Sequence, residues 1–194
     1  QWVRIRPEFT KNDSTQLLFA SVLDSQRILL KWKTNPNAMG YSIERSAQMQ
    51  NSLTKDIMSP LQDSIIDTVP QATMRASYQY TLKMRDSCFN LSATSNTAQT
   101  IVLSRKNYNN EYIVLNWNAY ETWQNGVKEY VIQSSENNST WLPIDASGQL
   151  SYPDYRLQQL KSDTVYYRIK AIEQDGNLQY SYSNVVKVPL STTL

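Results

Sequence analysis

The stretch Ile28-Leu29-Leu30-Lys31-Trp32, followed by Tyr41-Ser42-Ile43-Glu44-Arg45, decides the fold because the chain repeats it. Its counterpart is Ile113-Val114-Leu115-Asn116-Trp117, followed by Tyr130-Val131-Ile132-Gln133-Ser134. The tryptophans of the two copies are 117 − 32 = 85 positions apart, and the tyrosines are 130 − 41 = 89 apart. Near-constant offsets of this kind indicate one unit that was duplicated with small changes in loop length.

The repeat continues toward the carboxyl end of each unit. Tyr80-Thr81-Leu82-Lys83-Met84 matches Tyr167-Arg168-Ile169-Lys170-Ala171, and Ser95-Asn96 matches Ser183-Asn184. Apolar residues occupy every second position from Tyr78 to Met84, which predicts a strand with one buried face. A unit of this length can bury its own core, so the sequence predicts an all-β fold of two consecutive β-sandwiches.

We expect residues 1–15 to form a leading strand or linker, residues 16–104 the first domain and residues 105–194 the second. Residues 105–110 are polar and are expected to be a short connector that restricts the relative orientation of the domains. Residues 47–61 are expected to hold a helical turn or a long surface excursion. The expected strands are Trp2–Arg6, Leu17–Val22, Arg27–Trp32, Tyr41–Arg45, Asp63–Val69, Tyr78–Arg85, Asn96–Leu103, Tyr112–Trp117, Lys128–Ser134, Thr140–Ile144, Leu150–Leu157, Val165–Ile172 and Ser183–Pro189.

Composition excludes several classes of function. Lys and Arg number 19 against 17 Asp and Glu, and this balance of charge argues against a surface for nucleic acid or anionic membrane. The chain has no His, which removes the commonest general base and the commonest zinc ligand. No apolar run approaches the roughly 20 residues that span a bilayer. The single Cys88 cannot form a disulfide within the chain, and we expect it to be a free thiol unless it pairs with a segment outside this sequence.

The carboxylates do not indicate a catalytic pair. Asp63 and Asp67 are four positions apart in an expected strand, which separates them by about 13 Å, too far for most glycosidase pairs. Asp145 and Asp154 flank another expected strand, and all four are interpreted as solvated edge or turn residues. We therefore expect no enzyme activity, no cofactor and no metal site, although a Ser-Lys centre stays open in principle.

The matched Trp and Tyr strands resemble the fibronectin type III superfamily over residues 17–190. More narrowly, Gly40–Arg45, Tyr80–Cys88 and Asn116–Val127 are similar to tandem modules of Bacteroidetes surface proteins that carry gliding-motility-associated sorting domains of type IX secretion. The sequence departs from that pattern at Phe89, where the modules usually have Gly. The resemblance implies a secreted, cell-surface or outer-membrane-associated protein, and the chain, which begins at Gln1 without a signal peptide, is expected to be a mature or excised fragment.

Aromatic residues in or beside loops of the second unit are the best candidates for a ligand site. Exposed rings can stack on sugars or anchor a protein partner. The candidate ligand platform consists of Trp123, Trp141, Tyr152 and Tyr155. Packing within the sandwich is the alternative explanation for these rings.

These observations predict a non-catalytic spacer and interaction module that positions neighbouring domains of a longer chain and binds a protein partner. The alternative is a carbohydrate-binding module that uses the exposed aromatics of the second domain, with a cell-surface glycan as its ligand. The two differ in whether Trp123 and Trp141 share one exposed face. No nucleic-acid partner and no membrane span are expected in this segment.

Overall fold

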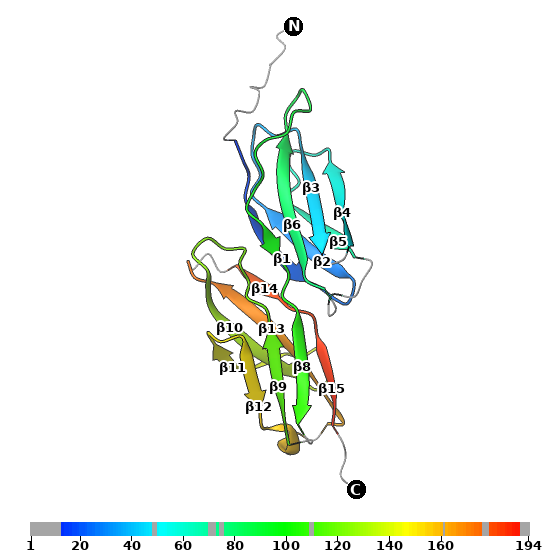
Figure 1. Cartoon of the computed structure of the whole chain (residues 1–194), viewed down its shortest axis with the longest axis vertical. Helices are drawn as coiled ribbons and strands as arrows, with labels where there is room; N and C mark the ends of the chain where they lie inside the picture. Colours follow the sequence, from blue (N-terminus) through cyan, green and yellow to red (C-terminus); the bar gives the residue numbers. More distant parts are fainter. Residues whose placement is uncertain are drawn as a thin grey trace.

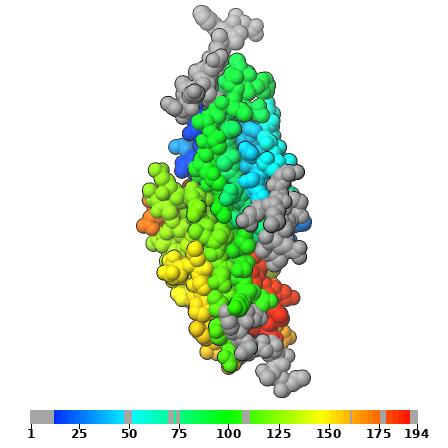
Figure 2. Space-filling view, in the orientation of Figure 1, coloured from blue at the N-terminus to red at the C-terminus, as the bar shows by residue number. Residues whose placement is uncertain are grey.

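The computed structural model describes residues 13–47, 50–69, 73, 76–108, 111–160, 162–175 and 179–190. These residues form two antiparallel β-sandwiches that lie end to end (Figure 1). The space-filling view shows a continuous, elongated body with no gap between the two sandwiches (Figure 2). The expected strand Trp2–Arg6 lies outside the described residues.

The first domain packs a three-stranded sheet against a four-stranded one. The strands of the smaller sheet are, in order, β1 (Leu17–Val22), β2 (Arg27–Trp32) and β5 (Ser64–Thr68). The strands of the larger sheet are, in order, β4 (Gln50–Ile57), β3 (Gly40–Ala47), β6 (Tyr78–Arg85) and β7 (Ala98–Gln99).

The second domain repeats this plan. Its smaller sheet contains β12 (Ser151–Asp154), β9 (Tyr112–Trp117) and β8 (Leu103–Tyr108), and a short 3-10 helix, η1 (Leu157–Gln159), follows β12. Its larger sheet runs β11 (Leu142–Ser147), β10 (Val127–Ser135), β13 (Thr164–Glu173) and β14 (Tyr180–Tyr182), and β15 (Val186–Pro189) also pairs with β13. The structure therefore confirms the predicted all-β fold of two consecutive β-sandwiches.

Each sandwich has its own hydrophobic core, as the repeated tryptophans predict. Trp32 packs on Tyr41 with 5.4 Å between ring centroids, and Trp117 packs edge-on to Tyr130 at 5.8 Å. All four rings are buried. The alternation in β6 is also confirmed, because its apolar side chains face the core while the intervening ones are half-buried or exposed.

The repeated Ser-Asn pair ties the two sheets of each domain together. Asn96 accepts a hydrogen bond from the backbone N–H of Leu17 and donates one to its C=O, at 2.8 and 3.0 Å. Asn184 does the same to Leu103 in the second domain, at 2.7 and 2.9 Å. An amide side chain can accept one hydrogen bond and donate another, so it can satisfy the N–H and the C=O of the same residue at once. Each Asn side chain therefore takes the place of a neighbouring strand at that residue.

Three expectations about local structure are wrong. The segment expected to contain a helical turn forms β4, whose pairing with β3 joins Tyr41 to Ile57. Of the residues expected to be a connector, 105–108 belong to β8, which pairs with β9 along its length from Leu103 to Tyr108, and 109–110 lie outside the described residues. The last strand expected in the second unit, Ser183–Pro189, is shortened to β15, and β14 forms before it where no strand is expected. In all three places a neighbouring strand, rather than the local sequence pattern, determines the structure.

Candidate functional site

The structure separates the four aromatic residues of the predicted platform. Trp123 is buried at the boundary between the two domains. Trp141 is half-buried just before β11, against the guanidinium of Arg168. Tyr152 lies on β12 in the other sheet and packs against the core, while Tyr155 follows that strand, is 65% exposed and contacts Tyr112. The rings do not form one face, and the platform stays a prediction.

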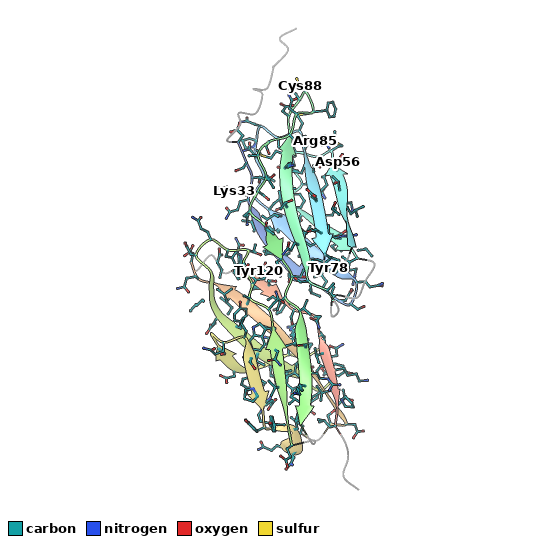
Figure 3. The ribbon with its side chains drawn as sticks, in the orientation of Figure 1. Lys33, Asp56, Tyr78, Arg85, Cys88 and Tyr120 are labelled. Atoms are coloured by element: carbon teal, nitrogen blue, oxygen red, sulfur yellow. The ribbon has the colours of Figure 1, made fainter. Side chains whose placement is uncertain are left out.

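The domain boundary is built by the loop between β9 and β10. The matched tryptophans and tyrosines are 85 and 89 positions apart, so the segment from Trp117 to Tyr130, which contains this loop, is four residues longer than the segment from Trp32 to Tyr41. It carries Tyr120 and Trp123, whose rings pack edge to face with 4.6 Å between centroids. Figure 3 shows Tyr120 at the level where the two sandwiches meet. The extra length therefore supplies the aromatic pair that fills the boundary.

Both aromatic side chains form hydrogen bonds with backbone groups at the outer edge of β1. Trp123 donates from Nε1 to the C=O of Leu18 at 2.7 Å. The hydroxyl of Tyr120 accepts from the N–H of Ala20 at 3.0 Å and donates to the C=O of the same residue at 3.3 Å. Burial raises the pKa of Tyr120 to about 12, so its hydroxyl stays protonated and able to do both at neutral pH.

Strand β14 completes the contact with the same edge. Ser181 donates from Oγ to the C=O of Ala20 at 2.8 Å, and the N–H of Tyr182 donates to Oγ of Ser21 at 2.9 Å. In addition, Asn96 donates to the C=O of Thr122 at 3.0 Å. An uncovered edge strand exposes unpaired N–H and C=O groups, and here the second domain satisfies them. The boundary is therefore a specific interface, which we call the junction.

A groove opens beside the junction. It has a volume of about 540 Å³ and is lined by residues of both domains, namely Leu23, Asp24, Ser25, Thr73, Asn138, Trp141, Tyr166, Arg168, Asn184, Val185 and Lys187. The first domain contributes the turn between β1 and β2, and the second contributes the outer face of its larger sheet. Sequence reasoning missed this groove because its two walls come from different units.

Arg168 is the most constrained cation of the groove. Its guanidinium lies between the rings of Trp141 and Tyr182, at 4.3 and 4.2 Å from their centroids. Its Nε donates to Oε1 of Gln133 at 2.8 Å. Burial lowers the pKa of Arg168. The side chain remains a cation at physiological pH because the ordinary pKa of an arginine side chain is very high.

Two of the carboxylates interpreted as solvated are instead paired, Asp154 in a fully buried position and Asp67 in a half-buried one. Asp154 is fully buried and accepts hydrogen bonds from the hydroxyl of Tyr167 at 2.8 Å and from Arg156 at 2.7 Å. Asp67 accepts the equivalent bonds from Tyr80 and Arg45, both at 2.8 Å. In both domains, a carboxylate and a tyrosine 13 positions later form this bond between the two sheets. The pairs therefore link the two sheets of each sandwich.

The carboxylate of Asp154 gives the second domain a dependence on pH. Burial disfavours its charged form, but the hydrogen bonds from Arg156 and Tyr167 outweigh that effect and lower the pKa of Asp154. A group whose pKa is lowered by folding stabilises the protein above its unfolded pKa of about 3.9, and that contribution is lost as the pH falls through the folded pKa.

We therefore expect the free energy of unfolding to decrease as the pH falls below about 4. The measurement is urea unfolding at pH 7, 4 and 2.5, for the unaltered chain and for Asp154→Asn. The variant should show a smaller decrease, because it has lost the titrating group. Equal decreases in the two proteins would contradict an acid-sensitive role for Asp154.

Within the described residues, no group of three or more His, Cys, Asp or Glu side chains is placed to hold a metal ion.

Cys88 is exposed, at the end of the first domain far from the junction (Figure 3). Phe89 has a backbone φ of 65°, in the left-handed region that glycine favours. The described part of the chain contains no helix whose length and apolar character would let it cross a bilayer.

No protein-family model matches the chain, and no curated protein matches it. Among solved structures, the chain is similar to a two-domain fibronectin type III segment of chicken tenascin, at 14% identity, covering 93% of this chain and all of that one, with a TM-score of 0.41. It is similar to the FN1–FN3 domains of chicken CNTN1, at 14% identity over 92% of this chain and 67% of that one, with a TM-score of 0.40. A myokine structure matches 44% of this chain and 92% of its own, at 9% identity and a TM-score of 0.39.

Proposed function

We propose that this segment is a non-catalytic spacer whose junction holds two fibronectin type III-like domains in one relative orientation. The observation that carries the proposal is the covered edge of β1, where Leu18, Ala20 and Ser21 all hydrogen-bond groups of the second domain. Sandwiches joined by a free linker would be expected to reorient, since contacts between domains are usually small. Here the contact uses buried aromatic rings and backbone groups, which favours a stiff unit.

A stiff pair of sandwiches suits a protein that holds neighbouring domains of its own chain away from a surface. We propose that the segment belongs to a secreted or cell-surface protein and presents or positions neighbouring domains, with protein partners as its expected ligands. The segments Gly40–Arg45, Tyr80–Cys88 and Asn116–Val127 support a place among the tandem modules of Bacteroidetes surface proteins. We also propose residues 16–104 and 105–194 as the two domains, although Leu103 already begins the first strand of the second sandwich.

The proposed orientation is testable by the distance between two spin labels. One label is attached to Cys88, the only cysteine, and the other to a Gln149→Cys substitution in the exposed turn between β11 and β12. We expect a single narrow distance distribution in the otherwise unaltered chain. Tyr120→Ala should broaden it, because this change removes the ring and both hydrogen bonds to Ala20.

The matched control is Tyr155→Ala, which removes an exposed tyrosine of the same domain far from the junction. We expect this variant to keep the narrow distribution. A broad distribution in the unaltered chain would rule out the spacer with a fixed orientation.

A further inference from the structure

The groove beside the junction contains positive charge that the described protein does not neutralise. Neither Arg168 nor Lys187 forms an ion pair among the described residues. Among the described residues, Asp24 is the only carboxylate that lines the groove, and it is paired with Arg27. Two cations therefore remain for a ligand, and the groove is complementary to negative charge.

The side chain of Arg168 is already oriented for an anion. The rings of Trp141 and Tyr182 fix the plane of the guanidinium, and the bond to Gln133 uses only its Nε. The N–H groups of its two terminal nitrogens have no hydrogen-bond partner in the described part of the chain. A guanidinium held in this way matches the two oxygens of a carboxylate at little entropic cost.

The other lining residues suit a ligand that is rich in hydroxyl groups. Trp141 and Tyr166 provide aromatic surface, and Asn138 and Ser25 provide an amide and a hydroxyl group. The volume of about 540 Å³ lies within the roughly 300–1,000 Å³ of small-molecule sites. We propose that this groove binds an oligosaccharide containing uronic acid, with Arg168 and Lys187 contacting its carboxylates and the aromatic rings packing against its sugar faces.

An acidic peptide is the less favoured occupant. Peptides commonly bind sandwiches by adding a strand to an open sheet edge. The outer face of the sheet that lines the groove is centred on β13, which is already paired on both sides, with β10 on one edge and β14 and β15 on the other. The groove therefore offers side chains rather than free backbone groups, and this arrangement favours a sugar.

The test is calorimetric titration of the full chain with three tetrasaccharides, made of galacturonic acid, of mannuronic acid, and of glucuronic acid alternating with N-acetylglucosamine. At least one should bind, and its methyl ester, which keeps the rings but lacks the charge, should bind at least tenfold more weakly. We expect Arg168→Lys, Lys187→Gln and Trp141→Ala each to weaken binding at least tenfold.

Lys170→Gln is the matched control, because Lys170 lies on the same strand and packs on Tyr180, which does not line the groove. It should change affinity less than twofold. Absence of binding by all three tetrasaccharides, equal binding of the ester, tighter binding of a hexaglutamate peptide, or an equal loss in Lys170→Gln would each overturn the proposal.

The groove rests on the proposed orientation of the two domains, since both domains line it. The spin-label distance of Arg168→Lys should equal that of the unaltered chain, so that a loss of binding reports the groove and not the junction. A broad distance distribution together with intact, charge-dependent binding would reject the fixed spacer and would place the sugar site on the second domain alone, which carries Trp141, Arg168 and Lys187.

Discussion

Replacing Asp154 by alanine is expected to lower the free energy of unfolding of the second domain by about 3 kcal/mol. The carboxylate is fully buried and receives hydrogen bonds from Tyr167 and from Arg156, which donates through two nitrogens. Removing it leaves the Tyr167 hydroxyl, on a fully buried side chain, without this acceptor. Arg156 is partly exposed and can be hydrated, so most of the cost comes from Tyr167.

Chemical denaturation at pH 7 measures the effect, and Asp67→Ala is its matched counterpart in the first domain. We expect a smaller loss there, about 2 kcal/mol, because Asp67 and Arg45 retain some contact with solvent. Tyr167→Phe combined with Asp154→Ala should recover part of the loss, since the unpaired hydroxyl is then gone. Asp154→Ala with unchanged stability would contradict the proposed role of the pair.

The strands of both cores could be predicted because each is determined by the pattern of apolar and polar residues within its own sequence. From Tyr78 to Met84 the alternation of apolar and polar residues is enough to define a strand and its buried face. The polar strand β4 could not be predicted in this way, since residues such as Asn51, Lys55 and Asp56 have no apolar period. Its structure comes from hydrogen bonding to β3, a contact that a single sequence does not reveal.

The functional surfaces were harder to predict because they depend on the relation between the two domains. Trp123 lies in a loop, where an aromatic ring is expected to be exposed, but it packs on Tyr120 and donates to the C=O of Leu18 in the other domain. The offset between the two units changes from 85 at the tryptophans to 89 at the tyrosines, which shows that this loop differs from its counterpart. The offset does not show what the loop contacts. Arg168 occupies an outward position of a strand, which does not distinguish it in the sequence. The rings that enclose it, Trp141 and Tyr182, belong to other strands and loops. Sequence periodicity describes faces within a domain and carries no information about contacts between domains.

Trp123→Ala is expected to uncouple the unfolding of the two domains. The side chain is 5% exposed, and replacing a buried Trp by Ala costs about 3–5 kcal/mol. The change removes the packing on Tyr120 and leaves the C=O of Leu18 without its partner at the edge of β1. Because both domains contribute to this contact, its loss should destabilise their association more than either core.

Differential scanning calorimetry separates these effects. The unaltered chain should unfold in one coupled transition, whereas Trp123→Ala should give two, one for each sandwich, with at least one at lower temperature. Trp141→Ala is the matched control, since this half-buried ring lies outside the junction and its contact with Arg168 contributes only about 1 kcal/mol. A single transition in Trp123→Ala, shifted no further than in Trp141→Ala, would show that the junction does not couple the domains. Two transitions in the variant would show that the longer loop of the second domain makes the pair one mechanical unit.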